Sequence, residues 1–202
     1  MAMALKTSVG GEYSGAPDEI LNVVLTSAMA GRRAMAVISD QDDEASAVVQ
    51  AVSSRMEAAG AVVMVVIADS GTTMQDLLDQ VPAPAANRNG ARSSESEALA
   101  LRLLQGEDAG LLTVVKAHEL EAGLLESLLS LSQIDFGDGR FVQVLLSGNG
   151  SLNAQLERPS EGTVARQVRV ERWLLAPQPQ VRIRPVSSGS GTAFRDRPQA
   201  GA

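Results

Sequence analysis

Four carboxylates crowded into a short run, Asp40, Asp42, Asp43 and Glu44, are the residues with the most evident chemistry in this chain. They follow the apolar stretch Ala34–Ser39 and lead into a helical pattern. In a parallel sheet, functional pockets lie at the carboxyl ends of strands, and phosphate-binding proteins place glycines and a lysine there. Backbone N–H groups and an ammonium are needed because the ligand is an anion. This run has the position of such a site and the opposite charge.

Two other kinds of chemistry have less support. The acidic run lacks the D-x-[DN]-x-[DN]-G spacing of a calcium loop, and helix N-termini favour acidic residues without any ligand, so we expect no metal. His118 is the only histidine, which excludes a histidine-based metal cluster, and we expect it to have a structural role. The chain has no cysteine, so thiolate chemistry is excluded.

The elements that would position this run alternate between strands and helices. The run itself leads into a helix whose apolar residues recur at intervals of three and four. The continuous β-branched stretch Ala61–Ala68 is typical of a central strand covered on both faces. Strands are predicted at Ala34–Ser39, Ala61–Ala68, Leu111–Val115, Arg140–Leu146 and Val164–Leu174, and helices near 17–30, 45–59, Thr72–Val81, Ser94–Gln105, Glu119–Leu131 and Ser151–Leu156.

This alternation predicts an α/β fold with a doubly wound, mainly parallel five-stranded sheet and helices on both faces. We expect a single domain at 17–177. It would lie between a flexible N-terminal arm at 1–16, rich in Gly and Ser, and a disordered tail at 178–202, rich in Arg, Ser, Gly and Pro.

The composition of the chain limits the kinds of partner that we expect it to bind. The net charge is −7 and aromatic residues make up 2% of the chain, so few side chains could stack on bases and we expect no nucleic-acid partner. No apolar run approaches the roughly 20 residues of a membrane-spanning helix, and the start lacks the sustained apolar segment of a signal peptide. We therefore expect a cytoplasmic protein without a transmembrane segment.

Residues 110–156 contain an apolar strand followed by Ala117 and His118, a leucine-rich helix LLESLLSLS, and a strand that ends in Leu146-x-Gly148-Asn149. In these features, and in element order from about Glu19 to Leu175, the chain resembles the AAA+ ATPase domain of the general-secretion-pathway A type. Those ATPases serve cell-envelope secretion and peptidoglycan remodelling. The resemblance implies a P-loop NTPase-like fold.

The resemblance also shows which family residues are missing. Members carry glycines, a lysine and a hydroxyl residue after the first strand, and an Asp-Glu pair at the end of the third. In this chain the lysine position holds Ala45, the hydroxyl position Ser46, and the Asp-Glu positions Val115 and Lys116. No catalytic residue is therefore predicted. The degenerate nucleotide pocket would comprise Ser39, Asp40, Gln41, Asp42, Asp43, Glu44, Ala45, Ser46, Val115, Lys116 and Asn149.

Two of these positions have alternative interpretations. Lys116 could replace the lost cation from across the pocket, but we favour an ion pair between Lys116 and Asp42, Asp43 or Glu44. Asn149 could face the pocket as a polar sensor, but the glycines beside it are equally explained by a strand-to-helix turn, which we favour.

The favoured hypothesis is a pseudo-ATPase without a lid domain that acts as a protein-binding or regulatory scaffold. Its partner would be a related ATPase or an envelope-assembly component, a homo-oligomer remains open, and no cofactor is expected. The alternative is a P-loop-type ATPase with a non-standard phosphate loop, which would bind ATP and Mg²⁺. An unrelated doubly wound regulator or small-molecule binder is also compatible with the fold, because fold does not fix function.

Overall fold

The computed structural model describes residues 6–7, 12–81, 94–104, 107–157 and 168–176 of the 202 residues. Seven strands form one sheet in the order β1-β2-β7-β3-β6-β5-β4, and every neighbouring pair is parallel except β1 and β2. Their bounds are Lys6–Thr7, Glu12–Gly15, Ala34–Ile38, Val62–Ile67, Ala109–Val115, Phe141–Gly148 and Glu171–Leu175 for β1 to β7. The predicted doubly wound α/β class is confirmed.

The predicted number of strands is wrong by two, because β1 and β2 lie in the segment expected to be a flexible arm. Strand β2 pairs in parallel with β7, where Glu12 is in register with Arg172 and Gly15 with Leu175. The Gly- and Ser-rich composition of this segment does not predict a strand. Strand β2 forms because it pairs with β7. The predicted tail at 178–202 lies outside the described residues, as do 164–167 of the predicted fifth strand.

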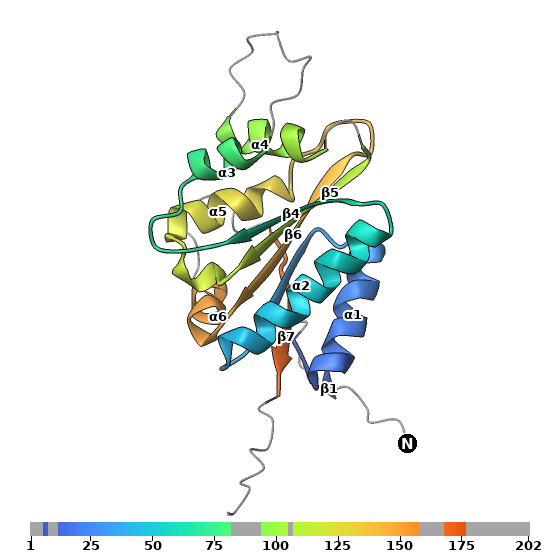
Figure 1. Ribbon diagram of the computed structural model, residues 1–202, viewed down its shortest axis with the longest axis vertical. Helices are drawn as coiled ribbons and strands as arrows, with labels where there is room; N and C mark the ends of the chain where they lie inside the picture. The colour runs from blue at the N-terminus through green and yellow to red at the C-terminus, as the bar shows by residue number, and fades with distance from the viewer. Residues whose placement is uncertain (1–5, 8–11, 82–93, 105–106, 158–167, 177–202) are drawn as a thin grey trace, which may run out of the picture.

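Two layers of helices cover the sheet (Figure 1). Helices α1 and α2 pack on one face, and α3, α4 and α5 on the other. None of the described helices is long and apolar enough to cross a membrane. The helices span Pro17–Met29, Asp42–Ala58, Met74–Gln80, Glu95–Leu104, Ala122–Leu131 and Gly150–Glu157 for α1 to α6, and a 3₁₀ helix, η1, spans Ala117–Glu119.

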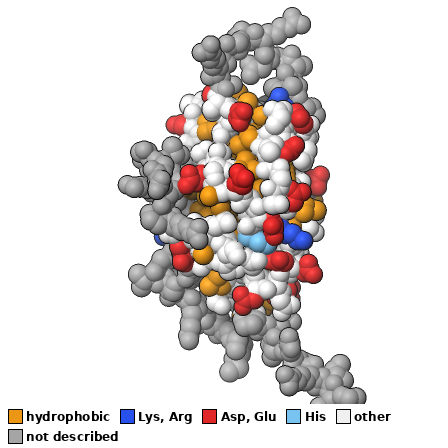
Figure 2. Space-filling view, turned by 90° about the vertical axis from the view of Figure 1, so that its left-hand side faces the viewer, with side chains coloured by type: hydrophobic (Ala, Val, Ile, Leu, Met, Phe, Trp, Pro, Cys, Tyr) orange, Lys and Arg blue, Asp and Glu red, His pale blue; other side chains and the backbone are white. Residues whose placement is uncertain are grey.

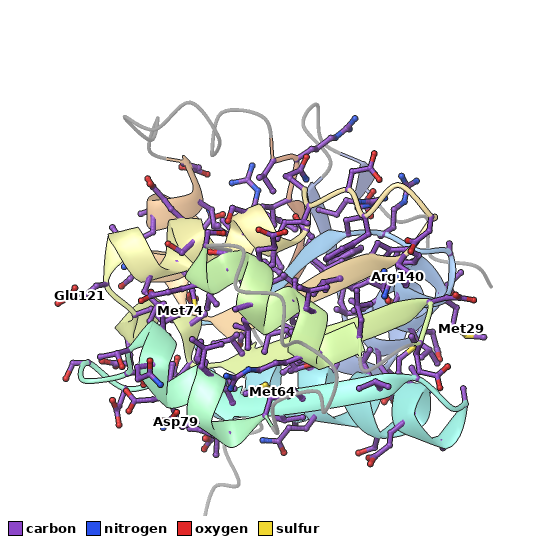
Figure 3. All side chains as sticks on the ribbon, turned by 90° about the horizontal axis from the view of Figure 1, so that it is seen from above. Met29, Met64, Met74, Asp79, Glu121 and Arg140 are labelled. Atoms are coloured by element: carbon purple, nitrogen blue, oxygen red, sulfur yellow. The ribbon has the colours of Figure 1, made fainter. Side chains whose placement is uncertain are left out.

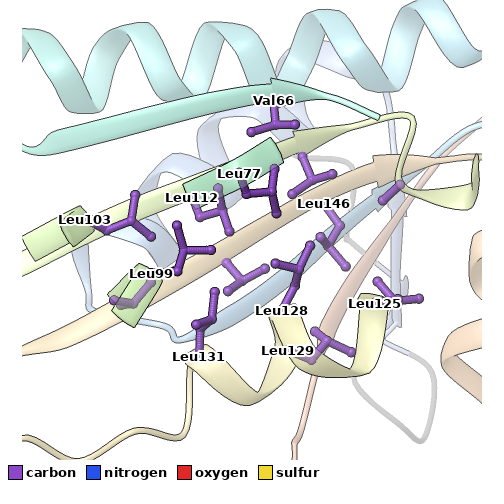
Figure 4. Close-up of a cluster of buried hydrophobic side chains, with 14 of the residues drawn as sticks. Val66, Leu77, Leu99, Leu103, Leu112, Leu125, Leu128, Leu129, Leu131 and Leu146 are labelled. Carbon is purple, nitrogen blue, oxygen red and sulfur yellow. The ribbon is translucent and has the colours of Figure 1, made fainter. Parts of the chain in front are cut away.

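Successive side chains of a strand pack against opposite layers of helices, because side chains alternate between the two faces of a pleated strand. In β3, Met35 and Val37 pack toward α1 and α2, whereas Ala34 and Ala36 pack toward α3, α4 and α5. The second layer is dominated by leucines (Figure 4), which is consistent with the chain's low aromatic content. The core is therefore mainly aliphatic, and among the described residues its one fully buried aromatic side chain is Trp173, on the side of α1 and α2.

Strand β4 lies at the end of the described sheet, so the prediction of a central strand covered on both faces is wrong. Val66 is buried, but Val65 and Ile67 are 44% and 67% exposed. β-branched side chains fit any pleated, half-buried surface, so the run does not determine the number of neighbouring strands.

Candidate functional site

The connection between β3 and α2 is a loop of three residues, Ser39, Asp40 and Gln41. Ser39 holds this loop closed. Its N–H donates to the Gly148 carbonyl at 3.0 Å, and its hydroxyl donates to Glu44 Oε2 at 3.3 Å. The same hydroxyl oxygen accepts from the Gln41 N–H at 3.0 Å. A phosphate loop of the form G-x-x-x-x-G-K-[ST] needs about six residues ahead of its lysine, with N–H groups free to bind the anion. The observed loop is shorter and uses the Gln41 N–H internally.

Most of the positions aligned with that motif are helical, because α2 already begins at Asp42. Acidic residues favour the positive end of the helix dipole, so Asp42, Asp43 and Glu44 stabilise a first turn here. Ala45, at the lysine position, is fully buried between α2 and the sheet. Ser46, at the hydroxyl position, donates to its own helix, from Oγ to the Asp42 carbonyl at 2.6 Å. Neither position presents a group to a ligand.

The end of β5 offers no Asp-Glu pair. Val115 is 2% exposed and belongs to the core on the α2 side. Lys116 is exposed and takes the left-handed conformation, φ 59° and ψ 40°, which costs a non-glycine residue about 1–2 kcal/mol. Its N–H donates to Ser147 Oγ at 3.4 Å. Within the described ranges Lys116 forms no ion pair, so the predicted pairing of its ammonium with the acidic run is wrong.

His118 makes the contact that was expected of Lys116. Its Nε2 lies 3.7 Å from Asp42 Oδ2 and 3.3 Å from Glu119 Oε1, and its side chain is only 8% exposed. The amide of Gln155 in α6 donates to the His118 carbonyl at 3.4 Å. Among the described residues, His118 Nδ1 and Asp42 Oδ1 have no hydrogen-bond partner. His118 thus connects η1 to the first turn of α2 and to α6, a contact that the sequence analysis missed.

The end of β6 is packed against the same histidine. A Cβ on Gly148 would lie 2.9 Å from Leu152 Cβ and 3.2 Å from His118 Nδ1. Asn149 caps α6, because its Oδ1 accepts from the Ser151 N–H at 2.9 Å and its carbonyl accepts from the Leu152 N–H at 3.0 Å. The favoured interpretation of Asn149 as a turn residue agrees with this geometry. Its side-chain oxygen is engaged and does not serve as a free polar sensor.

Two hollows lie at the carboxyl ends of the described strands. One, of about 230 Å³, borders the β3–α2 loop and is lined by Asp40 and by apolar residues such as Ile38, Leu174 and Leu175. The other, of about 300 Å³, lies between the loop after β4 and the start of α5. Sites for small molecules and cofactors span about 300–1,000 Å³. The hollow beside the loop is smaller than that range, and its charged residue is a carboxylate.

Charge on this part of the molecule is mostly negative. Figure 2 shows acidic side chains spread over one face, with the chain's single histidine among them. The described residues contain no group of three or more His, Cys, Asp or Glu side chains arranged to hold a metal ion. A short loop, strand ends without an Asp-Glu pair and mostly acidic charge are therefore what this site offers to a ligand.

Comparison with known proteins finds solved structures with a similar fold, but it finds no close relative. Neither a family model nor the sequence of a curated protein matches the chain. The structure of Aeropyrum pernix ORC1 in complex with DNA superposes with a TM-score of 0.51 at 16% identity, over 80% of this chain and 44% of that one. The structure of Drosophila ORC bound to AT-rich DNA and Cdc6 gives 0.50 at 17% identity, over 80% and 29%. The chain thus spans less than half of either protein, and the likeness supports an AAA+, P-loop NTPase-like fold.

Proposed function

We propose that this chain is a catalytically inactive AAA+-like module that acts as a protein-binding or regulatory scaffold. The observation that carries the proposal is the helical start of α2 inside the aligned phosphate motif, which buries Ala45 at the lysine position. A side chain at position 45 points into the core, so even a lysine there would not reach a phosphate without a change in the helix. The resemblance to the general-secretion-pathway A type favours a partner among related ATPases or envelope-assembly components.

Electrostatics support the same conclusion. A nucleoside triphosphate carries about four negative charges, and Asp40, Asp42, Asp43 and Glu44 all lie in the β3–α2 loop or the first turn of α2, where the aligned motif would hold its phosphates. Two like charges at about 4 Å repel by about 1 kcal/mol in water and about 4 kcal/mol at an effective dielectric constant of 20. His118 already lies between Asp42 and Glu119, so it is not placed to offset this repulsion.

A P-loop ATPase with a non-standard loop is the alternative. It would require the first turn of α2 to unwind, together with release of the Ser39–Glu44 hydrogen bond and of the Ser46 hydroxyl from its helix. A cation from elsewhere would still be needed to replace the missing lysine. Nucleic acid is not the partner we propose, although the two solved structures hold DNA, because the net charge of −7 opposes a polyanion.

Thermal unfolding with Mg²⁺–ATP and Mg²⁺–ADP tests the proposal. A ligand present at 100 times its dissociation constant adds about 2.7 kcal/mol of stability, whereas we expect no change in the midpoint of unfolding. The control is the double variant Asp42→Asn with Asp43→Asn, which removes two negative charges and leaves the loop short. We expect no nucleotide effect in this variant either. Stabilisation of the unmodified chain at micromolar nucleotide would overturn the proposal.

A further inference from the structure

Strand β4 is an edge strand without the features that normally protect one. Natural edge strands carry charged residues, prolines or bulges that prevent pairing with another sheet. The sequence of β4 is Val-Val-Met-Val-Val-Ile, which contains none of these. It is paired on one side by β5 over its whole length, from Val62 with Gly110 to Ile67 with Val115. Figure 1 shows it at the front edge of the sheet, between the two helix layers.

The residues that expose apolar side chains on β4 also direct their backbone groups outward. The Ala68 N–H donates to the Val115 carbonyl, so the backbone groups of Ala68 point toward β5. Because successive residues of a strand alternate, those of Val63, Val65 and Ile67 point away from the sheet. Their side chains share the α2 face, where Val63 is partly buried against the core and Val65 and Ile67 are largely exposed. The even-numbered residue Met64 instead packs toward α3 and α4 (Figure 3).

From this geometry we propose that β4 pairs with β4 of a second copy of the chain, in antiparallel orientation about a two-fold axis. Val65 lies opposite Val65 of the second copy, and Val63 lies opposite Ile67. Each such pair exchanges two backbone hydrogen bonds and brings β-branched side chains into contact, which is a favourable cross-strand combination. This register places the most exposed side chain of the strand, Ile67, against a valine.

Charge does not select the occupant of this edge, but the sequence of β4 itself fits a second copy. Each copy carries a net charge of −7, so two copies repel wherever their acidic surfaces meet. The six residues of β4 are uncharged and let two sheets join without opposing carboxylates. An isologous contact also requires a self-complementary surface. An apolar strand that pairs antiparallel with the same strand of a second copy provides such a surface. This inference goes beyond the proposed function and does not depend on the loss of nucleotide binding.

The first test is the mass of the full chain measured by sedimentation equilibrium or light scattering. We expect the mass to rise with concentration from 21.1 kDa toward about twice that value. The double variant Val65→Lys with Ile67→Lys should stay at 21.1 kDa, because it places charges on the edge as natural edge strands do. The control is Met29→Lys, which changes an exposed apolar residue of α1 instead of β4 and should dimerise as the unmodified chain does. A mass that stays monomeric, or an equal mass in the double variant, would overturn the proposal.

The second test uses the absence of cysteine, and it holds even if the lysine variant does not fold. Val65→Cys alone should cross-link to itself with a short thiol reagent, and a mixture of Val63→Cys and Ile67→Cys chains should cross-link to each other. Equal cross-linking of Met29→Cys would contradict a specific contact, and no cross-linking of Val65→Cys would contradict the pairing centred on Val65. Dimerisation should strengthen with added salt, because salt screens the repulsion between two acidic copies. Weakening with salt would contradict the uncharged contact and indicate association through charged groups.

Discussion

Replacing Gly148 by alanine tests whether the junction of β6, η1 and α6 is too tightly packed to admit a ligand. The added Cβ would lie 2.9 Å from both Cβ and Cδ2 of Leu152 and 3.2 Å from His118 Nδ1. Leu152 is fully buried, and its Cβ is fixed to the backbone of α6, so it cannot rotate away from the new methyl group. Inserting a methyl group into such a core costs about 1–3 kcal/mol. In a domain of this size the midpoint of thermal unfolding should fall by about 2–4 °C for each kcal/mol lost.

The matched control for this variant is Gly150→Ala, two positions along the chain. In the described part of the chain nothing lies within 4 Å of a Cβ on Gly150, which begins α6. Alanine there should stabilise the protein by about 0.4–1 kcal/mol, because it restricts the unfolded chain. Urea unfolding followed by circular dichroism measures both variants. If Gly148→Ala were neutral, or shifted stability in the same direction as Gly150→Ala, the junction would have room for another group and our description of a closed site would be refuted.

Two further predictions concern structural hydrogen bonds. Gln143 is buried, and its amide donates to the carbonyls of Ala28 and Arg32 at 2.8 Å each. Gln143→Leu should therefore lower the free energy of unfolding, measured in urea titrations, by about 1–3 kcal/mol. An unchanged value would mean that these carbonyls find other donors. At the start of α3, hydrogen bonds from the Thr73 hydroxyl and N–H lower the pKa of Asp76 below its usual range. This stabilisation is present above the unfolded-state pKa, about 3.9, and is lost as the pH falls through the lower folded-state value. Asp76→Asn should therefore reduce stability at neutral pH and leave the difference from the unmodified chain smaller at low pH, and a difference independent of pH would contradict the assignment.

The sequence was sufficient for the elements whose pattern is local. Helix α2 repeats apolar residues at helical spacing, and those residues are buried as that spacing predicts. Strands β3, β5 and β6 are predominantly apolar, and the structure places them beside one another in the interior of the sheet. Both kinds of pattern arise because the type of an element and its apolar positions depend mainly on the residues of that element.

Features that depend on distant partners were not predictable in the same way. Strand β2 is part of the sheet because it pairs with β7, and nothing in its own Gly- and Ser-containing sequence marks it as a strand. The edge position of β4 depends on strand order, which its β-branched sequence does not encode.

At the candidate site, too, the residues at each position were known from the sequence, whereas a contact between distant residues was not. In the alignment suggested by the resemblance, the sequence alone placed Ala45 at the lysine position and Val115 and Lys116 at the Asp-Glu positions. The contact between His118 and Asp42 was not evident from the sequence, because it requires η1 to follow the left-handed residue Lys116 and turn the histidine toward α2. The available signal for this contact was a single histidine just after β5, together with an acidic run at the carboxyl end of β3, two strands away in the sheet.

Isothermal titration of the full chain with ATP and ADP in the presence of Mg²⁺ is the measurement that tests the central claim most directly. The short β3–α2 loop, the buried Ala45 and the acidic residues beside them predict no binding heat above that of dilution. A saturable isotherm with a dissociation constant in the micromolar range would contradict the account, because it would require a phosphate-binding loop that the helical start of α2 excludes.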